Sequence, residues 1–232
     1  MISHRIKAGL CFLIVIILAA LRVTYADYDY TYYYYEVYNQ VRFSPVYVPL
    51  FLLIISSEAD IASNIFVAVR ASGRFNIVML TWKRIVKDAV IYSTVFFAVM
   101  LVMSFTYGEF ADSAALLLAG LVNQSIGWIA IGTLYMMLSI ATDIPVLSFL
   151  LVFAAVLSTS YQVFENFWGS GFDYVNMMKT MYWFIEYDDV FIVIKRLLMY
   201  AAVSAAGVLI SYIFIRKKEY IKQDRRYENQ YR

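Results

Sequence analysis

The sequence is poor in the residues that most disulfides, metal sites and turns require. It contains one cysteine, Cys11, and one histidine, His4, so no internal disulfide, cysteine metal cluster or histidine-based catalytic pair is expected. Three prolines and nine glycines are too few for the turns of a β-barrel. Charged residues make up 16% of the chain, against about 25% in a typical soluble domain. These shortages argue against a secreted disulfide scaffold, a disordered protein and an ordinary cytosolic enzyme.

Hydrophobic residues are abundant instead. They account for 62% of the 232 residues, and the mean hydropathy is +0.67. A soluble globule of this size cannot hide so much apolar surface from water. We therefore expect an all-α protein that crosses a membrane several times.

Six segments approach the roughly 20 apolar residues that a helix needs to cross the hydrocarbon core of a bilayer. They are residues 8–26, 41–57, 89–106, 114–140, 145–164 and 197–215. The second is the weakest, because Arg42 stands at its start and Pro45 and Pro49 lie inside it. The chain has no repeat of fixed period and no separate soluble segment, which indicates a single transmembrane domain over residues 1–232.

The distribution of basic residues predicts the orientation. With six spans both termini lie on one side, and that side carries 14 of the 19 lysines and arginines. Because basic segments stay in the cytoplasm, we expect both termini, the segment 58–88 and the basic tail 216–232 to be cytoplasmic. The segments 27–40 and 165–190 would then lie outside. An alternative treats residues 1–26 as a cleaved signal peptide, which would leave five spans in the same orientation.

Both predicted outer segments are rich in aromatic residues. Eight tyrosines lie between Tyr25 and Tyr38, and tyrosine favours the headgroup level of a membrane. They are interpreted either as an interfacial belt or as an aromatic rim that contacts an amphipathic cargo. The segment 165–190 has no uniform apolar run, so short interfacial or re-entrant helices fit it better than a seventh span.

The predicted cytoplasmic segment contains an amphipathic stretch. Its apolar residues recur at helical spacing, at Ile61, Ile65, Phe66 and Val69. Its polar residues Asp60, Ser63, Asn64 and Arg70 lie off that stripe. Gly73 can end the helix, and Arg74 follows it. Such a helix would lie along the inner membrane surface, and the alternative is an ordinary basic loop.

Taken together, this layout resembles the membrane subunit of a type-2 ABC exporter, a bacterial permease. Members of that family typically end the second span with a Glu. An amphipathic stretch and a small-residue turn with an Arg follow, and a Lys opens the third span. The matching positions are Glu58, the stretch Ile61–Val69, the turn Ala71–Arg74 and Lys83. The family's usual Gly-Thr after the Glu is replaced by Ala62, Ser63 and Asn64, and Ser72 or Gly73 stands where its turn has Pro.

The resemblance implies a multi-pass protein of the bacterial plasma membrane that works with two partners besides membrane lipids. One is a separate ABC ATPase that docks on the amphipathic helix, and the other is a second permease subunit in a homodimer or heterodimer. The coupling residues would be Glu58, Ile61, Ile65, Phe66, Val69, Arg70, Arg74 and Lys83. The cargo would be an amphipathic peptide, a bacteriocin or a drug, moved outward for export or self-immunity.

The sequence cannot bind ATP through a phosphate-binding loop of the P-loop type. No Gly-Lys dipeptide occurs anywhere, so the motif G-x-x-x-x-G-K-[ST] is absent. ATP and its Mg²⁺ would therefore bind the partner ATPase, and no cofactor is expected on this chain.

Two sets of residues within the spans are candidates for further roles. Asn123, Gln124 and Ser125 in the fourth span would either form interhelical hydrogen bonds or line a transport pathway. Small residues at helical spacing in the last span predict close helix packing, within the subunit or across a dimer. They are Ala201, Ala202, Ala205, Ala206 and Gly207.

Two other functions are weighed against the exporter. A substrate-capturing membrane subunit of an ATP-driven importer is also small and six-spanning, but it lacks a coupling helix after the second span. An intramembrane protease would need paired Asp, a Ser/His pair or metal ligands in its spans, and His4 lies at the terminus. We therefore expect neither enzymatic activity nor a metal on this chain, and no nucleic-acid partner.

Overall fold

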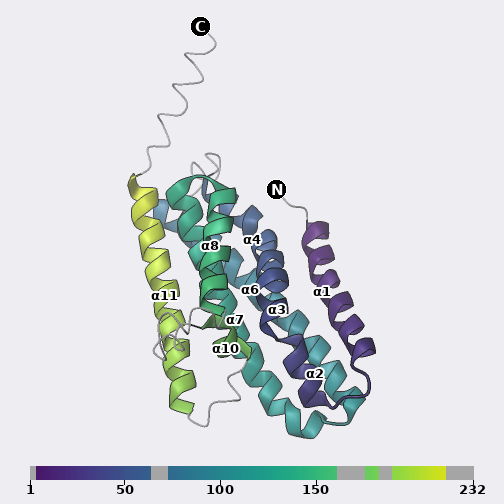
Figure 1. The fold of residues 1–232 in the computed structure, drawn as a ribbon. Helices are drawn as coiled ribbons and strands as arrows, with labels where there is room; N and C mark the ends of the chain where they lie inside the picture. Colours follow the sequence, from purple (N-terminus) through teal and green to yellow (C-terminus); the bar gives the residue numbers. More distant parts are fainter. Residues whose placement is uncertain (1–3, 64–72, 161–175, 183–189, 218–232) are drawn as a thin grey trace.

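Helices run along the long axis of the molecule and form a bundle (Figure 1). The computed structural model describes residues 4–63, 73–160, 176–182 and 190–217, and helices account for nearly all of these residues. The elements are α1 (His4–Thr24), α2 (Tyr30–Val37), α3 (Gln40–Arg42), the π-helical η1 (Phe43–Tyr47), α4 (Val48–Ser63), α6 (Arg74–Tyr107), α7 (Phe110–Thr142), α8 (Pro145–Ser160), α10 (Met177–Tyr182) and α11 (Val190–Lys217).

Five helical stretches are long and apolar enough to cross a membrane. They are Arg5–Thr24, Tyr30–Glu58, Arg74–Tyr107, Phe110–Thr142 and Phe191–Lys217. The described part of the apolar helix α8, Pro145–Ser160, rises about 24 Å, and residues 161–164 of the predicted fifth span lie outside the described residues. The chain is thus an all-α protein with several helices of membrane-spanning length, and a sixth crossing through α8 stays a prediction.

The second stretch begins earlier than the predicted span 41–57. The helices α2, α3, η1 and α4 follow one another almost without interruption, so helix α2 occupies part of the predicted outer segment 27–40. Asp29 caps α2, because its side chain accepts a hydrogen bond of 2.7 Å from the Tyr32 backbone N–H. Pro45 lies inside η1, and Pro49 follows in the first turn of α4. Proline removes a helical N–H donor, which explains the widened π turn at this point.

Four of the tyrosines between Tyr25 and Tyr38 are buried inside the bundle. Tyr30, Tyr33, Tyr34 and Tyr38 are at most 5% exposed, and the first three share one face of α2. The Tyr33 hydroxyl donates to the Leu18 carbonyl of α1 at 2.9 Å, and the Tyr34 hydroxyl donates to the Tyr182 carbonyl of α10 at 2.9 Å. The interpretation as an interfacial belt is therefore wrong for these four residues, because their rings and hydroxyls join helices to one another.

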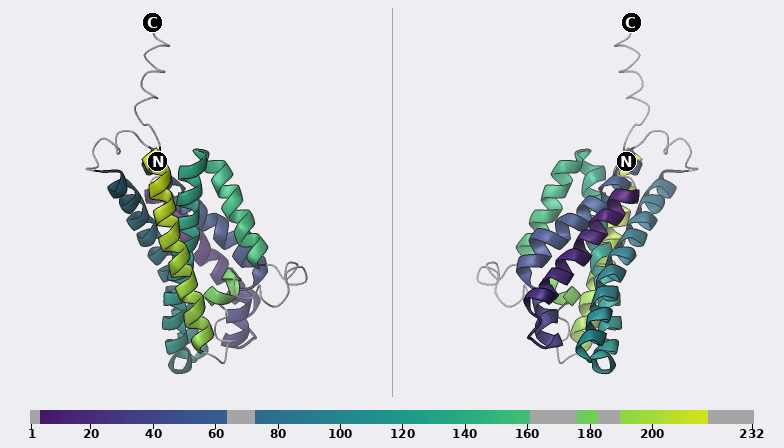
Figure 2. Two further views of the ribbon diagram at one scale, coloured as in Figure 1. Left: turned by 90° about the vertical axis from the view of Figure 1, so that its left-hand side faces the viewer. Right: turned by 90° about the vertical axis from the view of Figure 1, so that its right-hand side faces the viewer.

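The helix α7 is central to the bundle. It contacts α4, α6, α8, α10 and α11, whereas α1 lies at one edge against α2, α4 and α6 (Figures 1 and 2). Gly108, with φ 79°, ends α6 in the left-handed conformation before α7 begins. At the other end of α7, the predicted short turn at 141–144 consists of Asp143 and Ile144, and Pro145 starts α8.

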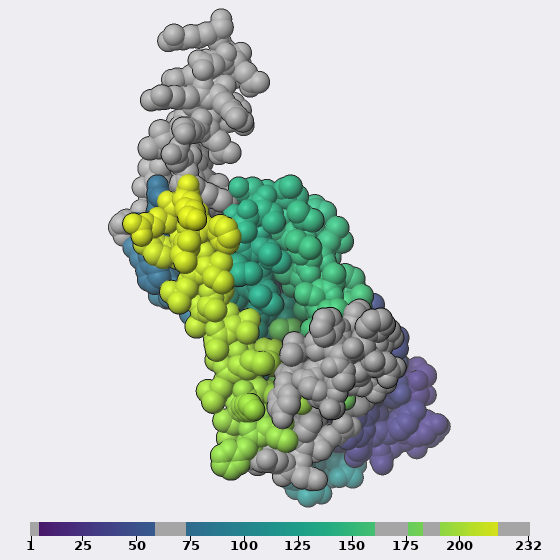
Figure 3. Space-filling model, turned by 60° about the vertical axis from the view of Figure 1, so that its left-hand side comes forward, coloured from purple at the N-terminus to yellow at the C-terminus, as the bar shows by residue number. Residues whose placement is uncertain are grey.

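One end of the bundle collects the start of α1, the ends of α4 and α11, the start of α6 and the turn between α7 and α8 (Figure 1). We call it the terminal end. The helix α6 begins there at Arg74 rather than near Ala89, the predicted start of the third span. The helix continues through charged residues because Lys and Arg are good helix formers even where hydropathy falls. In the space-filling view α11 (yellow) and α8 (green) occupy the same face near this end (Figure 3).

Candidate functional site

A cluster of four charged residues lies near the terminal end, and we call it the charge cluster. Lys7 of α1 ion-pairs with Glu58 of α4, and its ammonium lies 2.6 Å from the Asp88 carboxylate of α6. Arg84 of α6 lies 3.4 Å from the second oxygen of Glu58. The side chains of Lys7, Glu58 and Asp88 are only 13–14% exposed, whereas that of Arg84 is 44% exposed. The cluster thus joins three helices through one bridging lysine.

The charges of this cluster balance, which allows it to be half-buried. Two cations face two carboxylates, and removal of these groups from water is tolerated only when each charge has a partner. Because Lys7 serves both carboxylates, its loss would leave Glu58 and Asp88 close together, with Glu58 still paired to the exposed Arg84. Lys7 and Asp88 were not among the residues predicted for coupling. The sequence does contain an indication of their role, since Lys7 and Asp88 are charged residues that directly precede the predicted spans 8–26 and 89–106.

A second contact at the terminal end joins α6 to α11. The Arg74 guanidinium donates a hydrogen bond to the backbone carbonyl of Arg216, in the last turn of α11. A cation is favourable at this position because the carbonyls at a helix C-terminus carry partial negative charge. Glu58 and Arg74 therefore stand on either side of residues 59–73 and tie those flanks to α1, α6 and α11.

The structure describes the remaining predicted coupling residues to different extents. Lys83 is exposed on α6. Ile61 belongs to the last turns of α4, but its side chain lies outside what the structure describes. Ile65, Phe66, Val69 and Arg70 lie outside the described residues altogether. The predicted amphipathic helix is therefore untested, and only its flanks can be placed.

The polar residues of the fourth span face the interior of the bundle. Asn123 and Gln124 are each 4% exposed. The Gln124 amide lies 3.4 Å from the Tyr38 hydroxyl, and the Tyr38 ring stacks on Tyr182 with 4.2 Å between ring centres. The hydroxyl of Ser125 donates within its own helix, to the carbonyl of Leu121.

An aromatic cluster extends from these residues along the centre of the bundle. Its rings are those of Tyr38, Phe43, Tyr47, Phe51, Tyr92, Phe96, Trp128 and Tyr182. Two buried polar atoms of the cluster, Trp128 Nε1 and Tyr182 Oη, have no hydrogen-bond partner among the described residues, and neither has Gln124 Oε1 beside it. Such atoms are costly in a protein interior, by about 1–3 kcal/mol each, so they mark a place where a polar group or water is expected to bind.

Of the small residues of the last span, one is packed against another helix and four are exposed. Gly207 is buried against α7, and a Cβ at this position would lie 2.7 Å from Thr133 Cγ2. Ala201, Ala202, Ala205 and Ala206 are exposed in the single chain. Ala201 and Ala205 line an apolar groove between α6, α7 and α11.

Metal-ligating side chains do not gather anywhere in the described part of the chain. Within residues 4–63, 73–160, 176–182 and 190–217, no three His, Cys, Asp or Glu residues lie close enough together to hold a metal ion. Comparison of the chain with protein-family models, with curated proteins and with solved structures gave no match.

Proposed function

We propose that this chain is the transmembrane subunit of an ABC exporter, one half of a dimeric pathway powered by a separate ATPase. Support for a membrane role comes from the five helices of membrane-spanning length. Support for coupling comes from the charge cluster and the Arg74 contact at the flanks of residues 59–73. The terminal end faces the cytoplasm in this proposal, because the segments predicted to lie on that side carry 14 of the 19 lysines and arginines of the sequence.

The charge cluster is the observation that carries the proposal. A coupling segment is useful only if a push on it moves the spans, which requires stiff connections at both of its ends. Glu58 connects the first flank to α1 through Lys7 and to α6 through Arg84. Arg74 connects the second flank to α11. A push by the ATPase on residues 59–73 would therefore reach four helices at once: α1, α4, α6 and α11.

The interior of the bundle fits an amphipathic cargo. The aromatic cluster offers apolar ring faces, and Gln124, Trp128 and Tyr182 offer buried polar atoms without described partners. A peptide or drug with both apolar and hydrogen-bonding groups would satisfy both features once the helices part. We accordingly assign the pathway to the region around Tyr38, Gln124 and Tyr182.

A matched pair of substitutions in the coupling segment tests the proposal. Phe66→Ala removes one large apolar side chain from the predicted docking stripe, and a hot-spot truncation of this kind costs about 2 kcal/mol or more. We expect the ATPase to bind more than about tenfold more weakly in a pull-down from co-expressing membranes, with a matching loss of export. Membrane insertion and the basal activity of the ATPase should be unchanged.

Ser63→Ala, on the polar side of the same stretch, is the control and should bind and export like the wild type. Wild-type docking and export by Phe66→Ala would contradict the coupling assignment, and the turn at Asp143 or the basic tail would become the next region to test.

A further inference from the structure

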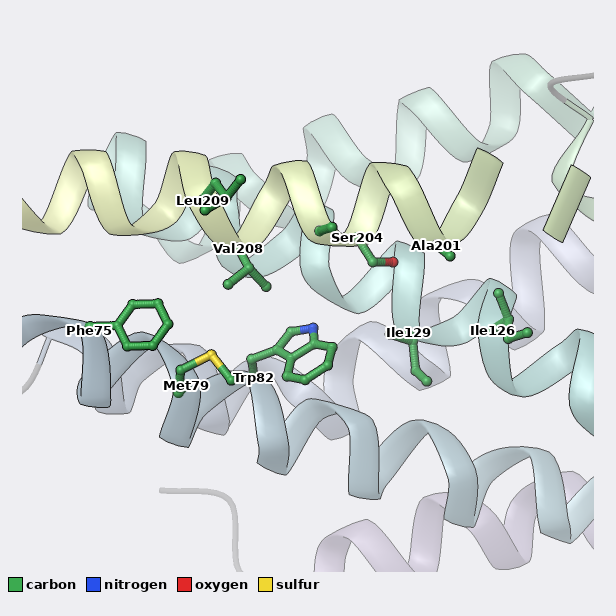
Figure 4. Close-up of a pocket in the computed structure, with 10 residues that line it drawn as sticks. Phe75, Met79, Trp82, Ile126, Ile129, Ala201, Ser204, Val208 and Leu209 are labelled. Atoms are coloured by element: carbon green, nitrogen blue, oxygen red, sulfur yellow. The ribbon is translucent and has the colours of Figure 1, made fainter. Parts of the chain in front are cut away.

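An apolar groove runs between α6, α7 and α11, on the surface of the bundle (Figure 4). Its volume is about 530 Å³. Phe75, Met79 and Trp82 of α6 form one wall, Ile129 of α7 lies between the walls, and Val208 of α11 points toward α6 from the opposite wall (Figure 4). Ala205 and Leu209 of α11 also line the groove. This volume lies within the usual range for sites that bind small organic molecules.

The walls of the groove are hydrocarbon, and their few polar groups are already hydrogen-bonded. The Trp82 indole donates to the Thr133 hydroxyl at 3.2 Å, and the Ser204 hydroxyl donates to the Tyr200 carbonyl at 2.9 Å. The groove therefore has little to offer a sugar, a nucleotide or a peptide backbone. A ligand that fills the groove must therefore be apolar over the length that it places there.

The length of the groove matches one leaflet of a bilayer. On α11 it extends over the eight-residue interval from Ala201 to Leu209, about 12 Å of helix. Half of a 30 Å hydrocarbon core is about 15 Å. All three helices that line the groove belong to candidate membrane spans.

The groove ends beside a cluster of positive charge. Phe75 and Tyr212 meet edge to face across its terminal end, with 5.5 Å between ring centres. Immediately beyond this pair lie Arg74, Arg216 and Lys217, all exposed. None of these three forms an ion pair with another residue that the structure describes. Three cations at the mouth of an apolar groove have the charge complementary to an anionic headgroup.

We propose that this groove is a binding site for an anionic phospholipid of the leaflet at the terminal end. One acyl chain lies along Phe75, Trp82 and Ala205, and the phosphate lies at Arg74, Arg216 and Lys217. The site is independent of the proposed export function. Its chemistry requires only a membrane whose leaflet contains acidic lipid.

A second copy of the chain is the competing occupant, because Ala201 and Ala205 present a small-residue surface. Two copies in one membrane have the same orientation, so a symmetric contact through this groove would bring both basic ends to the same level. Arg74, Arg216 and Lys217 of the two copies would then repel one another. A lipid phosphate neutralises them instead.

Photolabelling of the purified full chain tests the lipid site. The chain is placed in nanodiscs that contain either phosphatidylglycerol or phosphatidylcholine with the same diazirine-bearing acyl chain. After illumination, mass spectrometry locates the labelled peptides. We expect labelling around Met79–Trp82 and Ser204–Leu209, stronger with phosphatidylglycerol. The double change Arg74→Gln and Lys217→Gln should reduce that preference by about fivefold for each charge removed.

Two neighbouring alanines of α11 provide a matched control. Ala205→Trp fills the groove and should abolish its labelling, whereas Ala202→Trp, on an exposed face outside the groove, should leave the labelling unchanged. Equal labelling from both lipids, or labelling that Ala205→Trp does not reduce, would overturn the proposal. So would an intermolecular disulfide at Ala205→Cys in a Cys11→Ser background in native membranes, because it would assign the groove to a dimer.

Discussion

Lys7 shows how one side chain joins separate helices near the terminal end. Its ammonium contacts Glu58 of α4 and Asp88 of α6, and the three side chains are largely shielded from water. A pair of this kind is weak evidence for stability as a whole, because desolvation offsets the attraction. Removal of Lys7 alone is expected to lower the stability of the protein, because it leaves the Glu58 and Asp88 carboxylates close together without the cation that they share.

We therefore expect Lys7→Met to destabilise the protein by about 2 kcal/mol. Thermal unfolding in a mild detergent, followed by circular dichroism, measures the change. Arg5→Met removes an exposed positive charge from the same helix and should be within about 0.5 kcal/mol of the wild type. Adding Asp88→Asn to Lys7→Met should restore part of the loss, since it removes the uncompensated repulsion. Equal stability of Lys7→Met and Arg5→Met would show that the charge cluster is not a structural link.

At the scale of elements, apolar length predicts most of the helices but not their true ends. The spans over 8–26, 114–140 and 197–215 correspond to α1, α7 and α11, because each is a predominantly apolar run with no proline and no charged residue in its middle. The helix α6 begins at Arg74, well before its apolar part. In this first part only helix propensity, and not hydropathy, indicates a helix. The helix α2 was missed because tyrosine suits a headgroup belt and a buried interface equally well.

Close approach of α6 to α7 gives a testable feature of the helix packing. A Cβ added at Gly132 of α7 would overlap the branched Cγ2 atom of Ile85, which cannot rotate away freely. We expect Gly132→Ala to lower the free energy of unfolding by about 1–2 kcal/mol through overpacking. The same detergent unfolding assay checks it.

Gly9→Ala in α1 is the matched control, since nothing lies within 4 Å of a Cβ at that position. It should be neutral or stabilising by up to about 1 kcal/mol, because alanine favours helix over glycine. If both variants unfolded at the same temperature, the close packing of α6 on α7 would be contradicted.

At the scale of the whole molecule, the sequence predicts an all-α membrane protein, whereas the candidate site depends on contacts between distant residues. Lys7 and Asp88 are 81 positions apart, and Gln124 and Tyr38 are 86 apart. Apolar periodicity says which helices exist but not which polar side chains they bring together. The groove beside Ala205 could not be predicted from the sequence either, because the spacing of its alanines is compatible with helix packing as well as with lipid binding.

The six-span arrangement is itself a prediction, and it implies which side of the membrane each segment reaches. In a Cys11→Ser background, Tyr32→Cys should react with a membrane-impermeant thiol reagent from outside. Tyr32 is 39% exposed and belongs to α2, which lies away from the terminal end (Figure 1). Glu228→Cys in the basic tail should react only after the membrane is opened. Labelling of position 228 from outside intact cells would contradict an even number of spans with cytoplasmic termini.

Purification of the full chain from its native membranes tests the exporter assignment most directly. Because the chain has no phosphate-binding loop, we predict that a separate ATPase with such a loop copurifies in near-stoichiometric amount. ATP hydrolysis should follow that subunit and disappear when it is removed. Recovery of the chain from intact membranes without any ATPase, or ATP hydrolysis by the isolated chain, would contradict the account.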